Sequence, residues 1–151
     1  MRVRVLSSGS KGNTTYIEAG GVKLLIDLGN TCKYVKEKLS IFNINAEEID
    51  AILITHPHID HVKGLKVFQK KYHTKVYLTE KMQEEINYLD NYQIIENHGE
   101  FRIASLLIHV IKTSHDAIDS VGYIIDDGKK SVVYKKRSKL LCFLFTIFWI
   151  R

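Results

Sequence analysis

Residues that mark secreted or multidomain proteins are scarce in this chain. Its 151 residues include one proline and two cysteines, and Cys32 and Cys142 stand alone without the paired spacing of a zinc or redox motif. Isolated cysteines of this kind are typical of reduced thiols in a cytoplasmic protein. Because repeats and low-complexity linkers are also absent, the chain is expected to form one domain.

Long apolar runs are missing as well. The N terminus, Met1–Leu6, alternates between apolar and polar residues as a strand does, so no secretory signal peptide is expected. The mostly apolar run Leu140–Ile150 has about 11 residues, whereas a membrane-spanning helix needs about 20. We therefore expect a cytoplasmic protein with no membrane partner. The apolar run is expected to form a buried strand, a dimer contact or an aggregation-prone segment.

Acidic residues and histidines do not occur after Asp127, and this sets the end of the chain apart. The sequence holds 22 Lys and Arg against 17 Asp and Glu, and five of the basic residues lie after Tyr134. Residues 1–134 are thus balanced at 17 against 17, so the basic excess cannot support nucleic-acid binding. We expect residues 135–151 to be an atypical basic and apolar tail, such as a shifted reading frame or a truncated gene would produce.

A cluster of potential metal ligands is the most informative feature of the sequence. His56, His58, Asp60 and His61 lie within six residues, directly after the apolar run Ala51–Ile54. Such a run reads as a buried strand, which places the cluster on the loop at its carboxyl end. Imidazole and carboxylate groups are ligands of Zn²⁺. Neighbouring side chains point in different directions, so we expect two ions, His56 and His58 holding one and Asp60 and His61 the other. The spacing predicts a two-metal hydrolytic site.

A histidine-rich loop without a metal is the alternative. Single histidines such as His73 and His98 are expected to be ordinary structural residues. Histidine has no special preference for strands or turns, and four polar side chains beside a buried strand would compete with packing. The metal site is therefore the favoured interpretation.

Other motifs stand in a recognisable order on both sides of the metal loop. They are the run Arg4–Thr14, the strand and turn Leu24–Gly29, and the segment Thr113–Tyr123 with His115. Together with the metal loop they resemble the metallo-β-lactamase superfamily and its YycJ/WalJ-like branch. The resemblance covers residues 1 to about 134 and identifies them as the N-terminal part of such a domain. It implies an α/β fold, an αββα sandwich of two mixed sheets with helices outside, whose second half is incomplete.

The resemblance also implies a ligand set. His115 would join His56 and His58 at the first ion, and Asp60 and His61 would hold the second. Asp60 would be the catalytic residue that orients the attacking water and receives its proton. Family members use two divalent ions, zinc or manganese. In the family an aspartate that bridges the ions and a final histidine follow, but this chain has no candidate for either after Asp127. We therefore expect this chain to keep one ion and to be catalytically impaired. The incomplete second half would also leave the strand Gly122–Ile125 and the hairpin through Tyr134 with an open edge, so we expect self-association.

The branch that the chain resembles is linked to DNA-processing exonuclease activity. The resemblance therefore implies a phosphodiesterase or exonuclease with nucleic acid as its substrate. A hydrolase of a lactam, lactone or thioester stays open as an alternative, because one fold hosts many chemistries. A truncated relic without catalysis is the second alternative.

Alternating and helical patterns predict the remaining elements. Asp27, at the end of its strand, is a candidate to hydrogen-bond a ligand histidine. The run Ser7–Asn13 is either a polar turn or a loop whose backbone amides approach an anionic substrate. The expected strands are Arg2–Leu6, Thr15–Glu18, Val22–Leu28, Lys75–Leu78, Gln93–Glu96, Phe101–Ile103, Leu106–Lys112, Gly122–Ile125 and Lys130–Tyr134. The expected helices are Tyr34–Phe42, Val62–Tyr72 and Glu80–Leu89, the last capped by Thr79.

Overall fold

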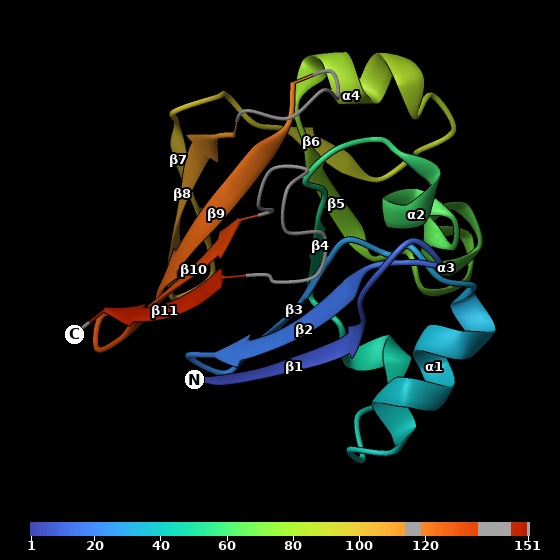
Figure 1. Cartoon of the computed structure of the whole chain (residues 1–151), viewed down its shortest axis with the longest axis horizontal. Helices are drawn as coiled ribbons and strands as arrows, with labels where there is room; N and C mark the ends of the chain where they lie inside the picture. Colours follow the sequence, from blue (N-terminus) through green and yellow to red (C-terminus); the bar gives the residue numbers. More distant parts are fainter. Residues whose placement is uncertain (114–118, 136–145, 151) are drawn as a thin grey trace.

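Two β-sheets lie face to face in the computed structural model, which describes residues 1–113, 119–135 and 146–150 (Figure 1). The first sheet is mixed, because its first three strands are antiparallel neighbours and the following strands run parallel. The central strand β4 is buried along its whole length, as expected for a parallel strand covered on both faces. The strand order is β1 (Arg2–Ser7), β2 (Thr14–Ala19), β3 (Val22–Ile26), β4 (Ala51–Leu53), β5 (Lys75–Leu78) and β6 (Tyr92–Ile94).

The second sheet is antiparallel at every described pairing. Its order is β11 (Thr146–Ile150), β10 (Ser131–Lys135), β9 (Val121–Asp126), β8 (Leu106–Lys112) and β7 (Glu100–Ile103). The expectation of two mixed sheets is therefore correct for the first sheet and wrong for the second. Short hairpin turns such as Asp127-Gly128 join neighbouring strands there, and a hairpin turn can connect only antiparallel strands.

Within the apolar run near the end of the chain, the described residues Thr146–Ile150 form the strand β11. It pairs with β10 in a regular register from Ser131↔Ile150 to Lys135↔Thr146. A buried strand was one of the structures expected for this run, and the strand is confirmed for the backbone of residues 146–150. An open edge at β10 was also expected, and this is wrong because β11 occupies it. The division of the chain at residue 134 stays a prediction.

Helices cover the outer face of the first sheet (Figure 1). Thr31 and Thr79 cap two of them, since their hydroxyls accept hydrogen bonds from the backbone N–H groups of Tyr34 and Met82. In the described part of the chain no helix lies on the outer face of the second sheet, and none is long and apolar enough to cross a membrane. The helices are α1 (Cys32–Ser40), the 3₁₀ turn Ala46–Glu48, α2 (Ile59–Val62), α3 (Leu65–Tyr72) and α4 (Glu80–Glu85).

The helix expected over Val62–Tyr72 is in fact two helices separated at Gly64. The Gly64 N–H donates to the carbonyl of Leu28, 2.9 Å away, and so leaves the helical pattern. A Cβ at Gly64 would lie 2.1 Å from the carbonyl oxygen of Asn30, so only glycine fits this close approach. Because of this break, α2 is a separate short helix, and it carries Asp60 and His61.

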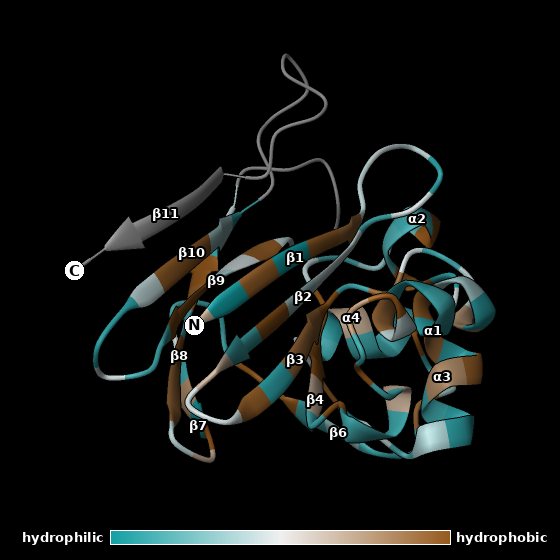
Figure 2. Cartoon of the chain, turned by 90° about the horizontal axis from the view of Figure 1, so that it is seen from below, coloured by the Kyte–Doolittle hydropathy of each residue, from teal (hydrophilic) through white to brown (hydrophobic). Residues whose placement is uncertain are grey.

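The core lies between the two sheets and under the helices. Figure 2 shows apolar residues along strands of both sheets, including β3, β8 and β10. In β8 the residues Leu106, Ile108 and Val110 face inward, as strand alternation predicts. Tyr123 on β9 is fully buried and donates its hydroxyl hydrogen to the carbonyl oxygen of Ile54. Burial, and then the negative charge of Asp27, raise the pKa of Tyr123 well above its usual value. The hydroxyl therefore stays protonated and joins the second sheet to the end of β4.

Candidate metal centre

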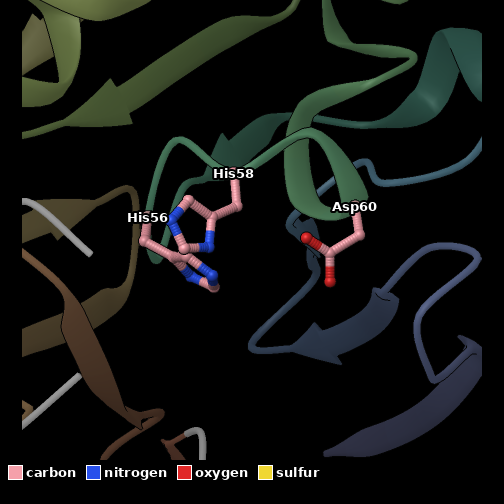
Figure 3. A group of neighbouring side chains, drawn as sticks. All are labelled: His56, His58 and Asp60. Atoms are coloured by element: carbon pink, nitrogen blue, oxygen red, sulfur yellow. The ribbon is translucent and has the colours of Figure 1, made fainter. Parts of the chain in front are cut away.

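The loop after β4 brings three candidate ligands together. His56 is buried, Asp60 is partly buried and His58 is exposed. One donor atom of each lies within 4.8 Å of the others, and Figure 3 shows the three side chains converging. The chain can do this because α2 begins immediately after His58, so Asp60 returns toward the two imidazoles instead of continuing away from them.

These three residues fit a divalent ion. Donors that each lie about 2.1 Å from one ion are at most about 4.2 Å apart, so the side chains need to close by less than about 1 Å. Two imidazole nitrogens and a carboxylate oxygen are a donor set that zinc and manganese both accept. His56, His58 and Asp60 could therefore hold one ion.

His61 is oriented by a buried carboxylate. The ring atom Nδ1 of His61 lies 2.7 Å from Oδ2 of Asp27, and both side chains are fully buried. The other ring nitrogen, Nε2, lies 3.4 Å from Oδ2 of Asp60. The hydrogen bond expected between Asp27 and a candidate ligand histidine is thus confirmed. Histidines that bind metals are commonly held by a carboxylate in this way.

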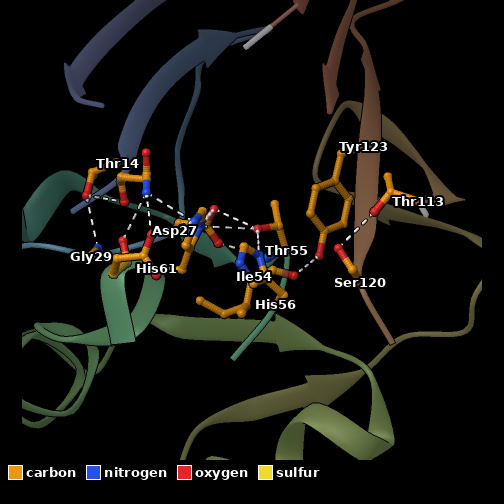
Figure 4. A network of polar contacts seen from close by, with 12 residues as sticks. Thr14, Asp27, Gly29, Ile54, Thr55, His56, His61, Thr113, Ser120 and Tyr123 are labelled. Carbon is orange, nitrogen blue, oxygen red and sulfur yellow. Dashed lines mark hydrogen bonds and ion pairs between the residues drawn. The ribbon is translucent and has the colours of Figure 1, made fainter. Parts of the chain in front are cut away.

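Asp27 also anchors the start of the metal loop (Figure 4). Its Oδ1 accepts the backbone N–H of Thr55 at 2.8 Å, and its Oδ2 accepts the Thr55 hydroxyl at 2.7 Å. The backbone at Asp27 has a φ of 59°, a left-handed conformation that aspartate tolerates better than most residues. One buried carboxylate therefore ties the end of β3 to both ends of the metal loop, Thr55 and His61.

The division of the four ligands into two pairs stays a prediction. A donor atom of Asp60 lies within 4.8 Å of donor atoms of His56 and His58. Oδ2 of Asp60 also lies 3.4 Å from Nε2 of His61, so Asp60 contacts residues of both expected pairs. The ring of His56 is in contact with both other imidazoles, with centroid distances of 4.8 Å to His58 and 3.8 Å to His61. All four side chains thus form one continuous cluster.

Asn13 belongs to this cluster although its sequence context did not single it out. Its side-chain Nδ2 donates to Oδ2 of Asp60 at 3.1 Å and lies 3.1 Å from Nε2 of His61. Its backbone N–H donates to the carbonyl of Asp60 at 2.7 Å. For the run Ser7–Asn13 a polar turn and a loop whose backbone amides approach an anionic substrate both stay predictions, and the contacts of Asn13 with the metal loop were not among them. A polar residue directly after a glycine-rich turn was the available signal.

Gly29 allows these segments to meet. Its N–H donates to the carbonyl of Asn13 at 3.0 Å. A Cβ at this position would lie 1.8 Å from the carbonyl oxygen of Asp60 and 2.5 Å from the backbone nitrogen of Asn13. Any side chain here must push the metal loop and the β1–β2 loop apart.

Replacing Gly29 with alanine is therefore expected to lower the free energy of unfolding by about 3 kcal/mol. Urea denaturation measures this change. Gly21→Ala is the matched control, because a Cβ there meets nothing within 4 Å and only the φ of 80° is unfavourable, at a cost of about 1 kcal/mol. Equal losses for the two variants would contradict the steric argument.

His115 lies outside the described residues, so its place in the ligand set is untested. The chain on either side of residues 114–118 does lie next to the metal loop. Thr113 N–H donates to the carbonyl of Ser120 at 3.0 Å, and their hydroxyls lie 2.8 Å apart. Val121 N–H donates to the carbonyl of Thr55 at 2.9 Å.

Comparison with known proteins agrees with this geometry. The family model of the metallo-beta-lactamase superfamily matches residues 8–133. Exodeoxyribonuclease WalJ of Streptococcus pneumoniae serotype 2 is 35% identical over 137 residues, which cover 85% of this chain and 51% of that protein. Exodeoxyribonuclease YycJ of Bacillus anthracis is 30% identical over 134 residues, again covering 85% and 51%. The chain thus spans about half the length of the curated relatives it matches.

The fold is shared with a solved structure as well. The metallo-beta-lactamase fold protein YhfI from Bacillus subtilis superposes with a TM-score of 0.76 at 21% identity, covering 87% of this chain and 60% of that one. The resemblance inferred from the sequence motifs is confirmed by the family match and by this fold. The chain therefore belongs to the metallo-β-lactamase superfamily, a family of metal-dependent hydrolases.

Proposed function

We propose that this chain is a metal-dependent phosphodiesterase that shortens DNA as an exonuclease. The observation that carries the proposal is the group of His56, His58 and Asp60 at the end of β4. The similarity of the chain to two proteins named exodeoxyribonucleases supports DNA as the substrate. A DNA substrate also fits the cytoplasm, which we propose as the location of the protein.

His56 and His58, with Asp60, would hold the first ion, and His115 is proposed as its third histidine. Asp60 and His61 would hold the second. When bound, such ions act as Lewis acids and lower the pKa of water toward about 7. Zinc and manganese are both candidates, because imidazole and carboxylate ligands accept either.

The protein's own groups have separate roles in this proposal. Asp60 stands at the mouth of the site with its side chain 25% exposed, so it can reach water and take its proton. Asp27 keeps the Nδ1 side of His61 occupied, so that Nε2 faces Asp60. Asn13 restrains the Asp60 carboxylate through a hydrogen bond at 3.1 Å.

Weak turnover is part of the proposal. Among the described residues, only Asp60 and His61 are proposed as ligands of the second ion, and two ligands are fewer than the three that a catalytic zinc site has. We therefore propose that this chain holds one ion tightly and turns over slowly. Self-association stays a prediction.

Three substrates assayed side by side test the function. With Mn²⁺ or Zn²⁺, we expect slow release of nucleotides from end-labelled single-stranded DNA, turnover of a generic phosphodiester and none of nitrocefin. Asp60→Ala should reduce both phosphodiesterase activities by more than about 100-fold, because it removes a ligand and the proton acceptor together.

Asp90→Ala is the matched control, since Asp90 is an exposed aspartate outside the metal cluster. It should leave all three rates unchanged. Nitrocefin hydrolysis without DNA cleavage would favour the lactam alternative, and no metal-dependent turnover of any substrate would favour the non-catalytic one.

A further inference from the structure

A pocket of about 390 Å³ opens beside Asp60, and none of the candidate ligand histidines is among its lining residues. Three segments that are far apart in the chain line it: the β1–β2 loop, the loop after β3 and the helix α2. The lining residues are Ser10, Lys11, Gly29, Asn30, Ile59, Asp60 and Lys63. Because Asp60 belongs to both features, whatever fills the pocket must lie next to the candidate metal centre.

Backbone hydrogen bonds hold the walls of this pocket in place. Asn13 N–H donates to the carbonyl of Asp60 at 2.7 Å, and Leu28 N–H donates to the carbonyl of His61 at 2.7 Å. Gly12 is packed so closely that a Cβ would lie 2.4 Å from the side-chain nitrogen of Asn30. The pocket is therefore a property of the locked backbone, and an occupant would not have to organise it first.

The charge of the pocket favours an anion. Lys11 and Lys63 are exposed, and among the described residues neither forms an ion pair with a carboxylate. Asp60 is the one acidic side chain among the residues that line the pocket, and a bound cation would offset its charge. Two ammonium groups then remain for one occupant.

We propose that this pocket binds a backbone phosphate of the DNA strand adjacent to the linkage being cleaved, through Lys11 and Lys63. The inference rests on the proposed function and adds the residues that would hold the substrate. Ser10 supplies a hydroxyl that can donate to a phosphate oxygen. Ile59, which is 71% exposed, offers an apolar surface for a sugar or base. A substrate with a single phosphate has nothing to place here, so the pocket selects a polyanionic strand.

Binding of DNA by metal-free protein tests this proposal without any need for turnover. Fluorescence anisotropy of a short labelled single-stranded DNA is measured in EDTA over a range of salt concentrations. The double variant Lys11→Ala/Lys63→Ala should bind about 10-fold more weakly at about 0.1 M salt. The slope of log K against log salt should become shallower by about 0.7, the value for losing one neutralised phosphate on a single strand.

The double variant Lys81→Ala/Lys129→Ala is the matched control, because it removes the same charge from two exposed lysines outside the pocket. An equal loss of affinity in the two double variants would overturn the proposal, since the effect would then be one of net charge. A strand with uncharged methylphosphonate linkages should bind wild type and pocket variant alike. A pocket effect on that strand would also overturn it.

The outcome can be separated from that of the proposed function. Failure of the function appears as loss of metal-dependent cleavage while the lysine pair still governs DNA binding. Failure of the pocket appears as unchanged DNA binding by the Lys11/Lys63 variant, whatever the cleavage rate.

Discussion

The His58→Ala variant is expected to lose the metal ion that wild-type protein retains. His58 is exposed and contributes one of three donors that lie within 4.8 Å of one another, so its removal leaves His56 and Asp60 with too few ligands for a tight site. After loading with Zn²⁺ and dialysis, elemental analysis should find about one ion per wild-type chain. The variant should retain close to none. Because His58 is exposed, its loss should leave the melting temperature of the metal-free protein almost unchanged.

A histidine outside the cluster provides the control for this measurement. His73 ends α3 with a φ of 53°, a left-handed conformation that asparagine tolerates, so His73→Asn removes an imidazole with little strain. Its zinc content should match that of wild type. Full zinc retention by His58→Ala would contradict the assigned ligand set. Two tightly held ions in wild type would contradict the single-site expectation.

Asp27→Ala is expected to produce the largest loss of stability among single changes near the site. It removes the acceptor of the Thr55 N–H, the Thr55 hydroxyl and the His61 ring, all of them buried. A buried polar group left without its partner costs about 1–3 kcal/mol, so the loss of three such contacts should cost several kcal/mol in total. Natural domains have only about 5–15 kcal/mol of stability. Urea denaturation of the metal-free protein should therefore show a large shift or a partly unfolded variant.

The isosteric variant Asp27→Asn separates loss of the charge from loss of volume. It keeps an acceptor for Thr55 and fills the same space, so its cost should be clearly smaller than that of alanine. Its zinc affinity should still fall by about 10–100-fold, because the support of His61 by a charged carboxylate is lost. A cost below about 1 kcal/mol for Asp27→Ala would show that the buried network contributes little to the fold.

Local patterns in the sequence were sufficient to predict several elements. The strands Lys75–Leu78 and Leu106–Lys112 occur with the bounds expected from their apolar patterns. Thr79 caps α4 as its hydroxyl and position suggested. These features depend on residues a few positions apart, where the period of a strand or the reach of a cap is set by backbone geometry alone.

Features that depend on distant segments could not be predicted in the same way. The break at Gly64 follows from contacts with Leu28 and Asn30, which a helical pattern over Val62–Tyr72 does not reveal. The pairing of β11 with β10 likewise depends on which edge the second sheet leaves open. In each case a contact between remote residues overrides the local preference.

For the site, the order of residues along the chain was enough to specify the chemistry. Three histidines and an aspartate within six positions after a buried strand supply metal ligands wherever that strand lies. Their orientation required the folded chain. Asp27 reaches His61 across 34 positions and Asn13 reaches Asp60 across 47, and Lys11 meets Lys63 at one pocket only because backbone hydrogen bonds hold their loops together. Residue types are carried by the sequence itself, whereas the distances between them arise only when packing excludes water and brings remote segments into contact.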